Sequence, residues 1–245
     1  MHANVDTKVW LPDPPPAPGE PTAQDLPPAR HYGLRRDGIR PPKFADKFAE
    51  IDFEADPMPV ISMFTPPAPR EIVNVRLAIR GEDLKSRIVS WKDLAGLPVH
   101  GPTVDLVCQI FNWHESVTWN GFRLADVLDA FDVQAPADGY LKISSADGQY
   151  FETLSIDHAR DSRVLLAFGM NGGPLPHEYG GPLRLVVPFL QGYKSVKWVE
   201  RLDVFKHDPI GIKRLLGQSK TSRLGQAWLD RLAIAPPTGR PSDPG

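Results

Sequence analysis

The distribution of proline is the feature that most limits how this chain can fold. The chain has 27 prolines in 245 residues, and 15 of them precede residue 71. Proline has no backbone N–H, so it disrupts helix interiors and is excluded from central strands. The first 70 residues are therefore predicted to form neither a sheet nor a long helix, and regular structure is expected to begin at about Glu71.

The N-terminal stretch "WLPDPPPAPGEPTAQDLPP" holds eight of these prolines and favours an extended, polyproline-like arm. Three readings stay open: a disordered tail, an arm lying across the domain, or a linker, the last two with Trp10 and Leu11 as apolar anchors. We predict an arm and irregular segment over residues 1–58, a folded domain over residues 59–235, and a disordered tail over residues 236–245.

The composition is that of a globular protein. Hydrophobic residues make up 41% and charged residues 24%, and the formal net charge is -2 without a basic block, so we expect no nucleic-acid partner. A single cysteine excludes an intramolecular disulfide and a multi-cysteine zinc or iron–sulfur site. No signal peptide and no run of about 18 apolar residues is visible, so we expect no transmembrane segment and either a periplasmic or a cytoplasmic location.

Beyond residue 70, short alternating stretches predict strands. In residues 71–81, Val73, Val75, Leu77 and Ile79 lie on one face of a half-buried strand. Further strands are predicted over residues 102–111, 162–171, 181–189 and 195–205, the second of them ending at an Asn-Gly-Gly turn, and a hairpin over 140–156 turns at Ala146-Asp147-Gly148. Short helices are predicted over 90–97, with Ser90 as N-cap and Asp93 at the third position, and over 120–131. The tail over 208–234 is mildly helical. The class is therefore α+β, mainly β, without a G-x-G-x-x-G motif or a P-loop.

Cys108 has three interpretations. It alternates with Val104, Leu106 and Ile110 on the face that we expect to point inward, where a lone cysteine is most often a small core side chain. A nucleophilic cysteine needs a histidine to hold its thiolate, and no cysteine-hydrolase signature surrounds it. A single thiolate is a poor ligand set for a bare zinc ion, but it suffices for a metal that an organic cofactor already chelates.

His114 and Glu115, packed between aromatic residues, are either a general acid/base pair or a solvent-facing loop dipeptide. The sequence offers no third group to orient them.

A second cluster lies in "HEYGGPLRLVVPFLQGYKSVKW". Arg184 is flanked by apolar residues and is costly to bury without an anion, and its planar fork suits a phosphate. The following loop holds Gly192, Lys194, Ser195 and Lys197, and its backbone N–H groups are candidates for an anion nest. The alternative is an edge-strand arginine followed by a basic loop.

Taken in order, these stretches resemble the sulfite oxidase-like molybdopterin oxidoreductase family. The order is a strand ending in glycine ("VRLAIRG"), the "SWKDLAGLP" segment, a cysteine, W-x-G-x-x-L ("WNGFRL") and the "GPLRLVVP" and "GYKSVKW" stretches. It covers roughly residues 60–207. The resemblance implies a sulfite oxidase-type molybdopterin-binding fold, an oxidoreductase, and molybdenum and molybdopterin as cofactors.

The resemblance also implies the site residues. Cys108 corresponds to the cysteine whose thiolate binds molybdenum, and a soft thiolate suits a metal held by sulfur. The implied cofactor-binding residues are Ser62 and Phe64 in an early loop, Ser145 (with Ser144 one register away), Tyr179, Arg184, Ser195, Val196 and Lys197. Tyr179 departs from the family, which has histidine or asparagine before the Gly-Gly-Pro turn; His177 stands two residues earlier.

The residues after Cys108 bear on the substrate. True sulfite oxidases follow the cysteine with Asn-Arg, whereas here "QIFNWHES" contains no arginine. A pocket framed by Phe111, Trp113 and His114, with Asn112, indicates a sulfoxide or another S- or N-oxide rather than sulfite. We therefore predict oxygen-atom transfer with Cys108, Asn112, Trp113 and His114 as catalytic residues.

Two alternatives stay open. Sulfite oxidation would need Arg80 or Arg123 near the metal, and a cofactor-free binding domain would keep only the fold. Because no C-x-x-C-H haem motif is present, we expect a separate electron-transfer partner such as a membrane haem protein or cytochrome. The dimerisation domain of sulfite oxidases is absent, so we expect a monomer.

Overall fold

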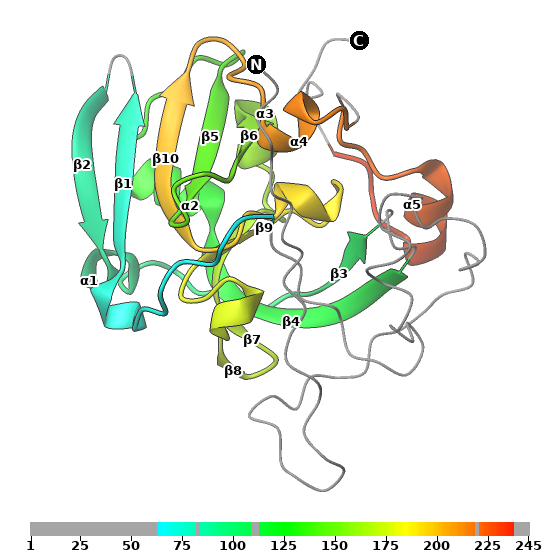
Figure 1. Cartoon of the computed structure of the whole chain (residues 1–245), viewed down its shortest axis with the longest axis horizontal. Helices are drawn as coiled ribbons and strands as arrows, with labels where there is room; N and C mark the ends of the chain where they lie inside the picture. Colours follow the sequence, from blue (N-terminus) through cyan, green and yellow to red (C-terminus); the bar gives the residue numbers. More distant parts are fainter. Residues whose placement is uncertain (1–62, 82–83, 109–112, 219–220, 238–245) are drawn as a thin grey trace, which may run out of the picture.

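The computed structural model describes residues 63–81, 84–108, 113–218 and 221–237 (Figure 1). The predicted proline-rich arm, most of the predicted tail, Ser62 and Asn112 lie outside these residues. The described chain forms two sheets and a few short helices, which confirms the α+β, mainly β class.

The first sheet, on the left in Figure 1, has the strand order β2-β1-β10-β5-β6. Its strands are β1 (Arg76–Gly81), β2 (Leu84–Ser90), β5 (Tyr140–Ser145), β6 (Phe151–Ser155) and β10 (Val199–Phe205). Only β1 and β10 are parallel; the other neighbours are antiparallel. The predicted hairpin between β5 and β6 is confirmed, and Gly148 in its turn has a φ of 75°, where glycine avoids the Cβ penalty.

The second sheet contains the segment that carries Cys108. Its strands are β3 (Thr103–Cys108), β4 (Trp113–Arg123), β7 (Leu165–Met170), β8 (Gly173–Pro174) and β9 (Arg184–Val186). Every pair in it is antiparallel. The long strand β4 pairs first with β3 and then with β7. At Gly121, the glycine of the W-x-G motif, a Cβ would lie 2.7 Å from the backbone of β7, so only glycine allows this approach.

Short helices connect the strands. They are η3 (Ile72–Asn74), α1 (Trp91–Leu94), α2 (Leu124–Ala130), α3 (Ile156–Ala159), η4 (His177–Tyr179), η5 (Gly192–Lys194), α4 (Ile212–Leu215) and α5 (Gln226–Leu232). The predicted capping of α1 is confirmed, because Ser90 Oγ accepts from the N–H of Asp93 while Asp93 accepts from the N–H of Ser90. The longest, α2 and α5, have seven residues each, so no helix of the described chain could cross a bilayer.

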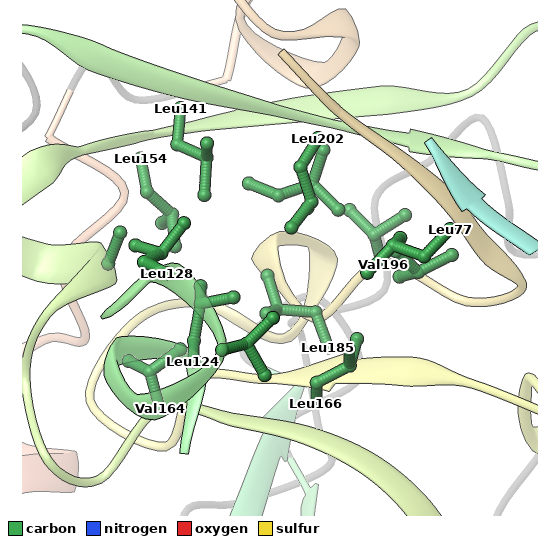
Figure 2. Close-up of a cluster of buried hydrophobic side chains, with 14 of the residues drawn as sticks. Leu77, Leu124, Leu128, Leu141, Leu154, Val164, Leu166, Leu185, Val196 and Leu202 are labelled. Atoms are coloured by element: carbon green, nitrogen blue, oxygen red, sulfur yellow. The ribbon is translucent and has the colours of Figure 1, made fainter. Parts of the chain in front are cut away.

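The main core lies between the first sheet, α2 and the strands β7 and β9. Figure 2 shows leucine and valine side chains from these elements converging on one another, together with Val196 from the loop before β10. A second apolar cluster covers one face of β4 and includes Leu106, Val117, Trp119 and Tyr179. The apolar positions that alternation predicted in β1, Leu77 and Ile79, are both buried.

The predicted start of the first strand and the loop interpretation of residues 114–115 are wrong. The first strand begins at Arg76 rather than at residue 71, because β2 ends at Ser90 opposite Arg76 and leaves no partner for earlier residues. Residues 72–74 form η3 instead, with Val73 58% exposed. His114 and Glu115 are not a solvent-facing loop dipeptide: both lie in β4, and each is 1% exposed.

Candidate functional site

Cys108 ends strand β3 and is partly exposed there. In the ladder between β3 and β4, Cys108 lies opposite Trp113 and Leu106 lies opposite Glu115. Because paired residues point to the same side and side chains alternate along a strand, Glu115 shares the face of Cys108. This is the face that the second apolar cluster covers, and we call it the cysteine face.

The opposite face of the same hairpin is covered by α5. Val107 packs against Trp228 of this helix, and the ring of His114 meets the Trp228 ring edge-on at 5.7 Å. His114 Nδ1 is 2.9 Å from Asp105 Oδ1, which also accepts from the hydroxyl of Ser116. Asp105 is thus the orienting group that the sequence did not offer, but it holds His114 away from the cysteine face.

Glu115 is the acidic group on the cysteine face. Neither of its carboxyl oxygens has a hydrogen-bond partner among the described residues. Burial raises the pKa of this carboxyl to about 7. Its charge reaches Tyr179, whose pKa burial and Glu115 together raise above the usual range. The sequence paired Glu115 with His114, whereas the strand pleat separates them onto opposite faces.

The loop from Gly192 to Lys197 lies next to β3. A Cβ on Gly192 would be only 2.9 Å from the carbonyl oxygen of Val107, the residue before Cys108. Lys194 does not point toward an anion site, as a basic cofactor loop would suggest. It is fully buried, and its Nζ donates to Glu152 Oε2 and to the carbonyl of Thr153, each at 2.8 Å. Lys194 therefore anchors the loop to β6.

The same loop is bonded to Arg184. The Arg184 guanidinium donates to the carbonyls of Tyr179 at 2.8 Å and Ser195 at 3.3 Å, and it lies 4.9 Å from the centre of the Trp119 ring. No carboxylate of the described chain pairs with it. Burial lowers the pKa of Arg184 to about 10. A cation in this position is costly without an anion.

Lys197 adds a second positive charge. Its Nζ donates to the carbonyl of Glu178 at 2.8 Å. Burial, and then the charge of Arg184, lower the pKa of Lys197 to about 7. Both groups are desolvated, and the charge of Arg184 disfavours the charged form of Lys197, so a bound anion would stabilise both cations.

Ser195 and Val196 serve the loop in different ways. Ser195 Oγ accepts from the N–H of Val187 at 3.0 Å and keeps its own proton for donation. Val196 points into the main core (Figure 2), so its side chain supports the loop rather than facing a ligand. The backbone N–H groups of Lys194, Ser195 and Val196 already donate to carbonyls of the loop, and the predicted anion nest is therefore not preformed.

Tyr150 joins three of the predicted segments. Its hydroxyl donates to the carbonyl of Tyr193 at 2.8 Å, and its ring lies 6.5 Å from that of Phe64. Its carbonyl accepts from the N–H of the buried Ser145. The structure thus brings Phe64, Ser145 and the 192–197 loop together, although the sequence gave no signal for Tyr150.

Residues 65–212 match the family described as the oxidoreductase molybdopterin binding domain, which covers more than half of the chain. The chain belongs to this family. It is an oxidoreductase of the sulfite oxidase-like group, and its cofactor is molybdenum bound by molybdopterin.

Individual relatives match parts of the chain. It is 32% identical over 112 residues to the protein-methionine-sulfoxide reductase catalytic subunit MsrP of Gluconobacter oxydans (strain 621H), which covers 40% of this chain and 36% of that protein. It is 38% identical over 98 residues to MsrP of Xanthomonas axonopodis pv. citri (strain 306), covering 35% and 30%. The chain thus matches about a third of the length of these relatives.

Among solved structures, the sulfane dehydrogenase SoxCD from Paracoccus pantotrophus is similar, with a TM-score of 0.52 and 26% identity. The likeness covers 58% of this chain and 40% of that one.

The residues of this molybdopterin oxidoreductase fit an anionic, metal-bearing cofactor. Arg184 and Lys197 are desolvated cations suited to an anion, and Cys108 offers a partly exposed thiol that forms no disulfide. The described chain contains no cluster of histidine, cysteine and acidic residues that would hold a metal unaided. A metal that arrives chelated needs no such cluster, so the donor set suits this cofactor.

Proposed function

We propose that this chain catalyses two-electron oxygen-atom transfer on a sulfoxide or a similar S- or N-oxide. Cys108 would bind the molybdenum, Arg184 and Lys197 would hold the anionic part of the cofactor, and Ser195, Ser145, Tyr179 and Phe64 would line its site. The bound cofactor supplies the redox change. The protein fixes the metal position, screens the cofactor charge and shapes the pocket.

The position of the arginines carries this proposal. Sulfite is a dianion and would need cations near Cys108, and Arg80 and Arg123 are the candidates in the sequence. Arg80 is exposed on β1 of the other sheet. Arg123 is exposed at the far end of β4, ten residues from Trp113, and at about 3.3 Å per residue this is about 33 Å along the strand.

The surroundings of Cys108 favour a neutral substrate. Leu106, Val117 and Tyr179 cover the cysteine face, and Glu115 is the ionisable group among them. A dianion such as sulfite would be costly to bury among these apolar side chains, whereas a polar but uncharged S=O or N–O group would meet a smaller penalty. Trp113, opposite Cys108 in the ladder, remains a proposed pocket residue. His114 would act only indirectly, because it lies on the other face.

Electrons would come from a separate partner. The sequence has a single cysteine and therefore no C-x-x-C-H haem site. Two relatives carry the words "catalytic subunit" in their names, which supports a division between a catalytic chain and an electron-transfer chain. A membrane haem protein or a cytochrome would fill this role.

The test begins with the full chain purified from a molybdopterin-competent host. We expect about one molybdenum per chain, and loss of the metal without loss of fold in Cys108→Ser. Molybdenum-free, fully folded protein from such a host would instead favour a cofactor-free binding domain.

A substrate screen with an artificial electron carrier separates the reactions. Sulfoxides, N-oxides, sulfite and reduced sulfur compounds are each assayed in the appropriate redox direction. We expect turnover of sulfoxides or N-oxides. Turnover of sulfite alone would overturn the argument from the arginine positions.

A further inference from the structure

Glu115 is an exception among the buried acids of this chain. Glu152 is also fully buried, but its carboxylate accepts from Lys194 Nζ and from the N–H of Lys213, each at 2.8 Å. Glu115 has no described hydrogen-bond partner on either oxygen. Native proteins rarely leave a buried polar group in this state, and such a group at a site is a candidate for function.

The surroundings of Glu115 favour its uncharged form. On the cysteine face it lies near Tyr179, which is itself neutral at ordinary pH, and across from the apolar Leu106. On the other face of the hairpin, Asp105 and His114 bond to each other. Burial alone raises the pKa of Glu115 to about 7, and no cation of the described chain lowers it.

Glu115 and Cys108 share one face of the hairpin. Leu106 lies opposite Glu115, and Cys108 follows two residues later on the same side of β3. Diagonal neighbours of this kind have Cα atoms about 7–8 Å apart. A carboxyl at this distance does not replace the thiolate as a ligand, but it can reach a molecule held between the two.

We propose that Glu115 is the general acid of this enzyme and donates a proton to the oxygen atom removed from the substrate. This inference rests on the proposed function. In the overall reaction a sulfoxide, two electrons and two protons give a thioether and water. The S–O bond breaks, two O–H bonds form, and an external one-electron donor supplies the electrons in two steps. Glu115 provides one proton and is reprotonated from solvent.

The experiment compares the wild-type holoenzyme with Glu115→Gln, with Glu115→Met, and with the surface control Glu200→Gln. Each protein is assayed for molybdenum content, for infrared absorption of protonated carboxyl groups between pH 5 and 9, and for reduction of a dialkyl sulfoxide by a reduced viologen dye. Glu200 is paired with Arg70 at 3.6 Å on the surface of the other sheet, which makes it a matched carboxyl-to-amide control.

The proposal predicts normal molybdenum content in both Glu115 variants and kcat lowered by about 100-fold or more, the usual effect of losing a general acid. The wild-type rate should fall as pH rises through about 7, together with the infrared band, and the variants should lack both changes. Glu200→Gln should match the wild type.

Three results would overturn the proposal: a Glu115 variant whose kcat stays within threefold of the wild type, an unchanged pH profile in that variant, or no carboxyl band that titrates near neutral pH. The infrared result tests the proposal even if neither variant folds, because the carboxyl band is measured on the wild-type protein. Failure of the proposed function appears differently, as a wild-type enzyme that contains molybdenum but reduces no S- or N-oxide.

Discussion

Gly192 lies so close to the carbonyl oxygen of Val107 that a Cβ at residue 192 would come within 2.9 Å of it. Val107 precedes Cys108, and Gly192 opens the loop whose later residues, Ser195 and Lys197, are the proposed cofactor contacts. The proposed metal ligand and the proposed cofactor loop are therefore fixed to each other through the backbone, at a point where only glycine fits.

Gly192→Ala should separate the loop from β3. We expect a destabilisation of about 1–3 kcal/mol, the usual cost of overpacking, and a lower molybdenum content per chain. The control is Gly96→Ala, because the nearest atom to a Cβ there is 3.7 Å away, an ordinary contact. Full metal content and unchanged thermal unfolding in Gly192→Ala would show that the two segments are not coupled.

The ion pair between Lys194 and Glu152 is expected to stabilise the fold rather than to bind the anionic cofactor. Both side chains are fully buried, so Glu152→Gln leaves a buried ammonium without its counter-ion and should cost about 3–5 kcal/mol in denaturant unfolding. The double variant Lys194→Met/Glu152→Met should recover part of this loss. Recovery should be incomplete because the N–H of Lys213 also loses its acceptor. If the double variant lost as much stability as Lys194→Met and Glu152→Met added together, this coupling would be contradicted.

Local turn and capping chemistry explains which elements the sequence predicts well. The hairpin between β5 and β6, the capping box of α1 and the Asn-Gly-Gly turn after β7 each depend on residues within a few positions of one another. Asn171 and Gly172 both have positive φ, as a tight hairpin turn requires.

Strand β4 shows why the rest was not predictable. Its first half carries His114, Glu115 and Ser116, which read as a polar loop. Both faces are nevertheless covered, one by the apolar cluster of Trp119 and the other by Trp228 of α5, more than 100 residues later. Alternation marks a strand only when one face meets solvent.

The same reasoning applies to the site. Arginine in an apolar strand and the order of motifs led to Arg184 and Cys108, because those signals lie in the sequence itself. The pairing of Lys194 with Glu152, and the division of His114 and Glu115 between two faces, depend on long-range contacts. The sequence therefore singles out the residues of the candidate site, whereas the contacts of Lys194, His114 and Glu115 come only from the structure.

Arg184→Lys should weaken cofactor binding although it keeps the charge. The guanidinium spans two carbonyls, those of Tyr179 and Ser195, which a single ammonium cannot reproduce. We expect a loss of cofactor occupancy of about tenfold or more at limiting cofactor, measured as molybdenum per folded chain. Arg160→Lys is the control, because Arg160 forms an exposed pair with Asp129 of the kind that contributes little. Full occupancy in Arg184→Lys would mean that charge alone is required.

Glu115 should make the folded protein less stable as pH rises. Its pKa is raised from 4.5 to about 7 in the folded state, so the folded protein binds this proton more tightly than the unfolded chain. The resulting stabilisation is complete below about pH 4.5, is lost as pH rises through about 7, and amounts to at most about 3 kcal/mol. Buried His158 acts in the opposite sense, since its pKa is lowered to about 4 and its contribution is lost as pH falls below about 6.5.

The difference in free energy of unfolding between the wild type and Glu115→Gln isolates the acid from His158, because both proteins keep the histidine. Measured in urea from pH 5 to pH 8, this difference should shift toward the variant by about 2–3 kcal/mol as pH rises. Glu200→Gln, with a half-buried carboxyl paired to Arg70, should run parallel to the wild type. Parallel curves for Glu115→Gln would mean that the carboxyl finds a partner or solvent in the folded protein, and the role proposed for it as an acid would lose its physical basis.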